Sequence, residues 1–332
     1  MVDIASDISV LDVLSSESGE KFCLVVELRS VDVKTAKNNT EYLAVTVGDR
    51  GAACSCKLFG NSPAYNFFRA ADPGTIMLLE GISESYNGTF SPRITFARAL
   101  SDDEIARGDY VRKVAVCAEE GVGALKADLK NIIDMIGNEK LRATVACVIV
   151  DAGDDFYERA AGISMHHAYK NGLLEHTIHV ARVGMKILPL YPFVDRDLAL
   201  AGLLLHDIGK VMEYAGDSPI QRTRIGVLQG HLVLGYRLVR KAALQSKLDG
   251  EILERLEHIL LSHHSDPEFG AVVRPATPEA VFVALIDNFD AKMGMVEQLL
   301  RSTPIKSIFS DFHKGLEGKL LVSPVDWGND SE

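Results

Sequence analysis

Cysteine and tryptophan are scarce in this chain of 332 residues, which contains five cysteines and one tryptophan. Five cysteines spread over this length do not make the dense disulfide framework of a small secreted domain. Cys54 and Cys56 stand in CxC spacing, but no second cysteine pair completes a zinc site, so we interpret both as plain thiols on a strand. The cysteine content therefore excludes a disulfide-rich scaffold.

Long apolar runs are also missing. No stretch reaches the roughly 18 apolar residues that a membrane span needs, and GAVVRPATPEAVFVALIDNFD is interrupted by prolines and acids. The N-terminal stretch MVDIASDISVLDVLSSESGEKF has neither a basic region nor a long apolar core, so it is not expected to be a signal peptide. We expect a cytoplasmic protein that has no membrane partner.

Positive charge is in deficit, because 35 Lys+Arg stand against 46 Asp+Glu and the net charge is -11. This balance argues against a broadly basic nucleic-acid-binding protein. A local basic groove is still compatible with it, since nucleic-acid contact depends on the local field. The hydrophobic content of 47% is ordinary for a globular protein, and the length suffices for two domains of about 100–200 residues each.

Residues 20–100 have the pattern of short strands. KFCLVVELRSVDV, NNTEYLAVTVGDRG and AACSCKLFG are rich in β-forming residues, and two more strands flank Asn87-Gly88, a dipeptide typical of hairpins. PAYNFFRAA lies between the third and fourth strands, where an OB-fold carries its helix. We predict a small β-barrel of the OB-fold type over 20–100, preceded by an N-terminal extension at 1–19.

From about residue 121 the apolar residues recur at i, i+3 and i+4, which is the helical spacing. This pattern predicts an all-α domain over 121–315, followed by a C-terminal tail at 316–332. The charged segment SDDEIARGDY predicts a linker at 101–120. The expected fold class is multidomain α and β, with an N-terminal small β-barrel and a C-terminal helical bundle.

Nine of the ten histidines fall between His166 and His264, and several of them follow apolar helical runs, as in LLLHDIGK and LLSHHSD. A single histidine in such a place is ordinarily a hydrogen-bonded core or capping residue. Five or six on successive helices instead indicate a metal site, because helix bundles build such sites from inward side chains. Imidazole and carboxylate suit first-row divalent metals, and a shared aspartate can join two ions.

The order His, His-Asp, His, His-His, Asp over residues 165–295 resembles the HD-domain superfamily of metal-dependent phosphohydrolases. The resemblance implies two metal ions, of which the first is held by His176, His206, Asp207 and Asp287, and the second by Asp207, His231 and one of His263 and His264. The sequence leaves open which member of the pair binds. Asp207 and Lys210 are the expected catalytic residues. Lys210 is expected on the same helix face as Asp207, where it would contact a substrate phosphate; its ordinary alternative is a solvated helix end.

The segments MHHAYKNGLLEHT, AGLLLHDIGKVMEY, GVLQGHLVLG, LSHHSDPEFG and ALIDNFDAKM resemble the YhaM-type 3′→5′ exoribonucleases, which pair an OB-fold with an HD domain. This resemblance implies stepwise removal of nucleotides from single-stranded RNA, or DNA, by a hydroxide that two metals activate. Mn²⁺ is the favoured ion, while Fe²⁺, Co²⁺, Ni²⁺ and Mg²⁺ are also compatible. The same resemblance also implies that His167 and Tyr169 line the substrate channel.

An OB-fold binds single strands by stacking bases on aromatic side chains along a basic groove. The predicted barrel offers Lys57, Phe59 and Tyr86 as substrate-binding residues, although core packing is the ordinary role of such aromatics. Residues 1–100 carry 9 Lys+Arg and 12 Asp+Glu, so the expected basic surface is modest.

Several other functions are compatible with these residues. An HD-type hydrolase of a free nucleotide or alarmone would use the barrel for regulation, and a mixed-valence di-iron oxygenase would use a similar ligand set. An RNA-binding adaptor with an inactive HD domain is disfavoured, because every ligand position is occupied. A cyclic-di-GMP phosphodiesterase is disfavoured too, since SHHSDPEFG lacks the GYP triplet that follows the paired histidines in those enzymes. A homo-oligomer is compatible with the sequence.

Overall fold

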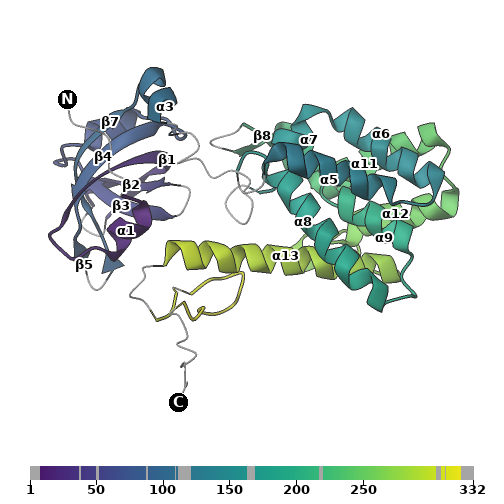
Figure 1. Cartoon of the computed structure of the whole chain (residues 1–332). Helices are drawn as coiled ribbons and strands as arrows, with labels where there is room; N and C mark the ends of the chain where they lie inside the picture. Colours follow the sequence, from purple (N-terminus) through teal and green to yellow (C-terminus); the bar gives the residue numbers. More distant parts are fainter. Residues whose placement is uncertain are drawn as a thin grey trace, which may run out of the picture. The chain divides into compact units, whose positions relative to one another are not determined.

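The computed structural model describes residues 8–36, 39–49, 52–86, 89–108, 110, 121–162, 169–216, 220–303, 308–310 and 312–322. The chain divides into two compact units, which are Met1–Val116 with Met295–Glu332, and Cys117–Gly294. Figure 1 shows the chain from purple at its N-terminus to yellow at its C-terminus, and the long strands all belong to the first unit.

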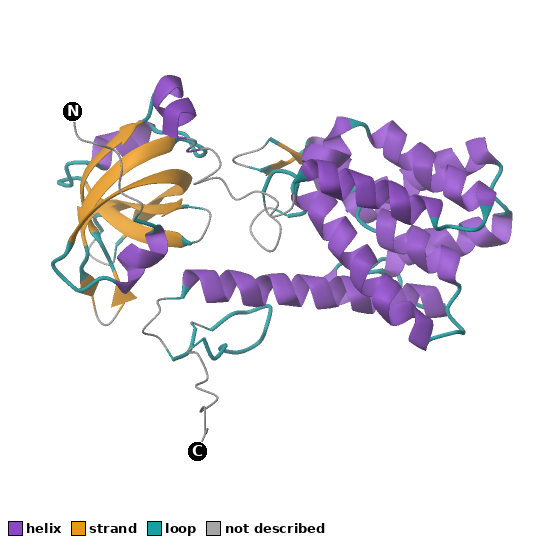
Figure 2. Cartoon of the chain, in the orientation of Figure 1, coloured by secondary structure: helices purple, strands orange, loops and turns teal. Residues whose placement is uncertain are grey.

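Five strands of the first unit form one antiparallel sheet in the order β3-β2-β1-β4-β7. Figure 2 shows this sheet in orange. These strands are β1 (Lys21–Thr35), β2 (Glu41–Gly48), β3 (Ala53–Phe59), β4 (Ile76–Ile82) and β7 (Arg93–Ala99). Buried and exposed side chains alternate strictly along β3, as expected for a strand that covers a core with one face. Helix α2 (Tyr65–Ala70) lies between β3 and β4 in the sequence. The predicted β-rich N-terminal domain is confirmed.

Two features refine the predicted barrel. The residues around Asn87-Gly88 form a separate short hairpin of β5 (Ser85–Tyr86) and β6 (Thr89–Phe90), inserted between β4 and β7; Asn87 and Gly88 themselves lie outside the described residues. Within the described part of the chain, no ladder of hydrogen bonds joins β3 to β7. Closure of the sheet into a complete OB-fold barrel therefore stays a prediction.

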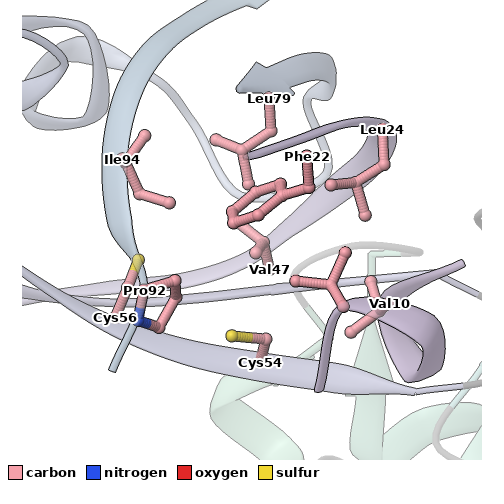
Figure 3. A pocket seen from close by; sticks show the side chains of 10 residues that line it. Val10, Phe22, Leu24, Val47, Cys54, Cys56, Leu79, Pro92 and Ile94 are labelled. Atoms are coloured by element: carbon pink, nitrogen blue, oxygen red, sulfur yellow. The ribbon is translucent and has the colours of Figure 1, made fainter. Parts of the chain in front are cut away.

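The core of the sheet is apolar and nearly filled. Figure 3 shows Val10 and Phe22 at a small cavity that Cys54 and Cys56 also line. Its volume is about 10 Å³, room for one water molecule at most. Burial raises the pKa of Cys54 to about 12, so this thiol is inert, in keeping with its interpretation as a plain strand residue.

Helix α1 (Val10–Ser15) contributes Val10 and Val13 to this core. The N-terminal extension predicted at 1–19 therefore includes a short helix that packs on the core of the sheet. The reason is local: Ser9 and Asp12 form a capping box that starts a short helix, and its apolar face then packs on the sheet.

The second unit is helical, as predicted. Its helices are α5 (Val122–Asp134), α6 (Glu139–Ala152), α7 (Asp154–Glu158), α8 (Gly172–Ile187), α9 (Arg196–Leu205), α10 (Lys210–Glu213), α11 (Arg224–Ser246), α12 (Gly250–Ser262) and the first part of α13 (Pro278–Ser302). Shorter elements are α3 (Asp102–Gly108) in the first unit, and η1 (Leu188–Leu190), the pair β8 (Tyr214–Ala215) and β9 (Gln221–Arg222), and η2 (Pro267–Phe269) in the second.

One core joins these helices, and α9 lies inside it. Every residue from Leu198 to Leu205 is buried, and α9 packs against α6, α8 and α12. Near-complete burial explains why the apolar run of α9 shows no polar face. Among the described residues, no helix is both long enough and apolar enough to cross a membrane.

Candidate metal centre

The seven histidine and aspartate side chains predicted as metal ligands lie together in the helical unit. They are His176 from α8, His206 and Asp207 from the turn after α9, His231 from α11, His263 and His264 from the end of α12, and Asp287 from α13. These positions are far apart in the sequence, so the packing of five helices is what assembles them.

The turn that carries Asp207 begins where α9 ends, at Leu205, and residues 206–209 form a turn between α9 and α10. This finding corrects the expectation that Asp207 and Lys210 share one helix face. Gly209 explains how close the turn comes to α11, because a Cβ at this position would lie 1.9 Å from the backbone oxygen of His231. A glycine here therefore allows the turn to bring Asp207 up to His231.

Helix α11 is kinked immediately before His231. Gly230 has φ 69° and ψ 159°, a conformation that a residue with a side chain rarely adopts. The helix restarts after the kink, so His231 lies in the first turn of the segment that packs against the turn at 206–209. Both glycines thus serve the same contact.

The two carboxylate oxygens of Asp207 face different histidines. Its Oδ2 lies 3.5 Å from Nε2 of His176 and 3.5 Å from Nε2 of His206. Its Oδ1 lies 3.5 Å from Nε2 of His231 and 3.6 Å from Nε2 of His263. Asp207 therefore stands between two groups of donor atoms, which is the arrangement of a bridging carboxylate.

We call these groups the first and the second sub-site. The first contains His176, His206, Asp207 and Asp287, and the second contains Asp207, His231, His263 and His264. In the first, Oδ1 of Asp287 lies 3.2 Å from Nε2 of His176 and 3.5 Å from Nε2 of His206. In the second, the Nε2 atoms of His231 and His264 are 3.2 Å apart. The structure thus brings both members of the His263/His264 pair to the second sub-site.

Each of the five histidines uses its other ring nitrogen, Nδ1, to contact an acceptor. The contacts are His206 to the oxygen of Leu203 at 3.0 Å, His263 to the oxygen of Leu260 at 2.9 Å, His264 to the oxygen of Phe269 at 3.0 Å, His176 to Oδ2 of Asp290 at 2.8 Å and His231 to Oε2 of Glu213 at 2.6 Å. A protonated Nδ1 leaves the lone pair of each Nε2 directed into the cluster.

These lone pairs require a positive partner. The Nε2 atoms of His176 and His206 are 3.2 Å apart, and when both rings donate through Nδ1 two acceptors face each other. Oδ1 of Asp207 and Nε2 of His263 are buried without a hydrogen-bond partner. Buried polar atoms of this kind need an explanation, and a cation in each sub-site satisfies all of them. A set of imidazole nitrogens and carboxylate oxygens fits first-row divalent metals.

The pKa values of the histidines differ between the two sub-sites. Burial disfavours charge on His206, but Asp207 and Asp287 outweigh it and raise its pKa to about 9. Burial and the neighbouring His263 lower the pKa of His264 to about 4. At neutral pH the first sub-site therefore carries protons that a metal would displace, whereas His264 is already a neutral ligand.

Lys210 lies beside the cluster as predicted, but its charge is directed at a carboxylate. Its Nζ is 2.6 Å from Oδ2 of Asp207, and the side chain is buried. Burial opposes a charged lysine, yet the attraction of Asp207 outweighs it and raises the pKa of Lys210. Lys210 is thus a fixed positive charge at the edge of the cluster.

The predicted substrate-binding residues have separate places. His167 lies outside the described residues, and the Tyr169 hydroxyl donates to Oε2 of Glu175, a buried carboxylate next to His176 in the sequence. Lys57 and Phe59 belong to the other unit, so they are not part of the metal cluster. Tyr86 lies in β5, but its side chain is outside what the structure describes.

Lys57 lines a groove on the sheet, and Phe59, two residues further along β3, is adjacent to this groove through its ring contact with Tyr42. The groove has a volume of about 530 Å³, and its lining includes Lys34, Tyr42, Lys57 and Phe90. The ring centroids of Tyr42 and Phe59 are 5.5 Å apart, and Nζ of Lys57 lies 6.0 Å from the centroid of Tyr42. Aromatic rings and cations thus lie side by side on this face.

Asp290 and Glu213 are site residues that the sequence reasoning missed. Both contact a ligand histidine, and both are buried. A signal existed, because Glu213 follows Lys210 by three residues and Asp290 follows Asp287 by three residues. Each therefore repeats a predicted site position one helical turn later.

Residues 173–292 match the HD domain family. The chain is 30% identical over 298 residues to the 3′-5′ exoribonuclease YhaM of Shouchella clausii, with 90% of this chain and 91% of the relative covered. It is 29% identical over 315 residues to the 3′-5′ exoribonuclease YhaM of Listeria monocytogenes serotype 4b, with 94% of this chain and 98% of the relative covered. The protein of the same name from Listeria innocua is equally similar.

Proposed function

Because the chain belongs to the YhaM family of 3′-5′ exoribonucleases and contains an HD domain, we propose that it removes nucleotides one at a time from the 3′ end of single-stranded RNA. The proposal extends to single-stranded DNA as a second substrate. The observation that carries it is the position of Asp207, whose two oxygens face two separate groups of histidines. Such a pair of sub-sites suits phosphodiester hydrolysis with two divalent metals.

We assign one divalent ion to each sub-site, with Mn²⁺ favoured. The second sub-site then uses both His263 and His264, since one faces Asp207 and the other faces His231. When bound, such ions lower the pKa of a water molecule and neutralise charge on the reacting phosphate.

The protein side chains hold and order this centre. Asp207 joins the two sub-sites, and the Nδ1 contacts keep every histidine turned inward. Lys210 offsets part of the carboxylate charge through its contact with Asp207 and lies where its ammonium group can pair with a phosphate oxygen. The Tyr169 hydroxyl donates to Glu175 in the first turn of α8, and we assign Tyr169 and His167 to the substrate channel.

We assign the groove of the sheet to the single strand upstream of the cleaved end. Tyr42 and Phe59 offer faces on which bases stack, and Lys34 and Lys57 pair with phosphates. We also assign Tyr86 to substrate binding; its strand β5 pairs with β6, whose Phe90 lines the groove. Asp32 also lines it and limits its positive charge, so weak and salt-dependent binding of RNA is expected.

The first test is hydrolysis of a 5′-labelled single-stranded RNA with Mn²⁺. We expect a descending ladder of products, its loss in Asp207→Ala, and its survival in the control Asp134→Ala, whose side chain is exposed at the end of α5. An intact RNA combined with cleavage of a free nucleotide would contradict the proposal and favour a nucleotide hydrolase. A ladder that survives in Asp207→Ala would place the chemistry elsewhere.

A further inference from the structure

The five inward-facing histidines are not held in the same way. His206, His263 and His264 contact backbone oxygens through Nδ1, whereas His176 and His231 contact carboxylates. One of these two histidines belongs to each sub-site. A backbone oxygen is neutral, but a carboxylate brings a full negative charge to the ring.

Asp290 approaches His176 from α13. Its Oδ2 lies 2.8 Å from Nδ1 of His176, and its Oδ1 lies 3.9 Å from Nδ1 of His179. The side chain is buried, and it follows Asp287 by one helical turn. One face of α13 therefore presents two carboxylates: Asp287, which belongs to the first sub-site, and Asp290, which lies behind His176.

Glu213 approaches His231 from the end of α10. Its Oε2 lies 2.6 Å from Nδ1 of His231, and its Oε1 lies 3.5 Å from Nε of Arg222. The backbone of Glu213 is also held, because its oxygen accepts from the amide of Thr223 at 2.9 Å. Gly226 lies so near that a Cβ there would be 2.4 Å from the same oxygen. Glu213 is therefore fixed by its surroundings.

We propose that Asp290 and Glu213 are positioning residues, one for each sub-site, which orient His176 and His231 and strengthen their Nε2 atoms as metal donors. The inference rests on the proposed two-metal function and adds to it the residues that set the affinity of each ion separately. A carboxylate behind a histidine fixes the ring and raises its basicity, and loss of such a partner typically costs about 10–100-fold in metal affinity. Neither carboxylate is assigned a contact with RNA.

The inference is tested by Mn²⁺ binding to the full-length protein without RNA, using equilibrium dialysis and electron paramagnetic resonance. We expect the unmodified chain to bind two coupled ions. Asp290→Ala and Glu213→Ala should each weaken the binding of one Mn²⁺ ion about 10–100-fold and leave the affinity for the other ion nearly unchanged. At limiting Mn²⁺, the resonance signal of two magnetically coupled ions should then disappear. Damage to packing in general would weaken both ions together, so the selective loss distinguishes positioning from a structural role.

Double variants identify which ion is lost. Asp290→Ala combined with His206→Ala should still bind one ion tightly, because both changes affect the first sub-site. Asp290→Ala combined with His264→Ala should bind neither ion tightly, because the changes affect different sub-sites. Asp128→Ala, which breaks a surface ion pair with Arg182 at 2.6 Å, is the matched control and should bind both ions normally.

Asp290→Asn and Glu213→Gln keep an acceptor oxygen without the charge, so they should fold even if the alanine variants do not, and show an intermediate loss. Two ions bound within about threefold of normal affinity in all four single variants would overturn the inference while leaving the proposed function intact. An unmodified chain that binds no Mn²⁺ would instead remove the proposed metal centre itself, and the inference with it.

Discussion

At the scale of single residues, the cluster depends on buried donor and acceptor atoms that each face a particular partner. Asp207 uses one oxygen for each sub-site, and three histidines turn inward because a backbone oxygen lies behind them. Such atoms cannot be exchanged for a similar group, because a changed donor or acceptor faces the wrong partner in a buried place.

Asp207→Asn is therefore expected to be as harmful as removal of the side chain. The amide keeps one acceptor but places an NH₂ group against one sub-site, and it removes the bridging charge. We expect RNA hydrolysis to fall by more than about 100-fold, the upper loss typical of a residue that only supports a ligand. Initial rates with the labelled RNA at saturating Mn²⁺ give the measurement, and Asp134→Asn serves as the control. Near-normal rates in Asp207→Asn would argue against a bridging role.

Gly209→Ala tests the contact between the Asp207 turn and α11. The added Cβ would lie 1.9 Å from the His231 oxygen and 2.6 Å from the Gly235 nitrogen, both of which are backbone atoms. We expect a loss of about 1–3 kcal/mol in the free energy of unfolding, together with weakened Mn²⁺ binding. Urea unfolding and equilibrium dialysis measure the two effects. Gly123→Ala is the control and should be neutral or slightly stabilising, because nothing lies within 4 Å of a Cβ at that position. Equal effects of the two substitutions would contradict the close contact between Gly209 and α11.

At the scale of elements, helix ends carry most of the site. Asp207 follows the end of α9, His231 follows the kink of α11, and His263 caps α12. The start of α13 is tied to two neighbours, because Oε1 of Glu279 accepts from the amide of Asp195 at 2.8 Å and Oε2 pairs with Arg255 at 2.8 Å. Glu279 thus holds α13, and with it Asp287, against α9 and α12.

This tie predicts a pH-dependent stability. Burial favours the neutral form of Glu279, but the Asp195 amide and Arg255 outweigh it and lower the pKa of Glu279. A lowered pKa stabilises the fold above the unfolded value of about 4.3, and this contribution is lost as the pH falls through the native value. Glu279→Gln should lower the free energy of unfolding at pH 7 by about 1.5–3 kcal/mol, with a gap that narrows in acid.

Urea unfolding followed by the helical circular dichroism signal at several pH values measures this gap. The control is Glu251→Gln, on the exposed first turn of α12. A difference between wild type and Glu279→Gln that stays constant from pH 7 into the acid range would show that Glu279 does not titrate as described.

At the scale of the whole molecule, the proposed function gives the two units separate roles. The cluster of histidines and aspartates lies within 117–294, and the groove lined by Tyr42 and Lys57 belongs to the sheet of the other unit. A substrate long enough to use both should therefore depend on both, whereas a small phosphodiester should depend on the helical unit alone.

Phe59→Ala and Lys57→Ala test this division. Loss of one stacking side chain costs about 1–3 kcal/mol, so the KM for single-stranded RNA should rise roughly 5–150-fold in Phe59→Ala. Lys57→Ala should raise it less and reduce the salt dependence. Hydrolysis of bis(p-nitrophenyl) phosphate should not change. Phe96→Ala removes an aromatic of similar exposure on β7, whereas Phe59 is the one whose ring contacts the groove residue Tyr42, and an equal rise of KM in Phe96→Ala would contradict the assignment.

The sequence alone determined what is local in this protein. Alternation predicted the strands, the i, i+3, i+4 spacing predicted the helices, and the clustered histidines with HDIGK indicated the HD resemblance. These patterns can be recognised from the sequence because each depends on residues that are close together along the chain. The same locality explains the errors, since a continued apolar pattern hid the turn after Leu205 and placed Asp207 on a helix.

Only the tertiary structure decided which distant side chains meet. Glu213 and His231 are 18 residues apart, and Asp290 and His176 are 114 apart, so no periodic pattern links them. The approach of Gly209 to α11, and the arrival of both His263 and His264 at one sub-site, likewise depend on how helices pack. Packing is a cooperative result of the whole core, whereas periodicity reports only which face of one element is apolar.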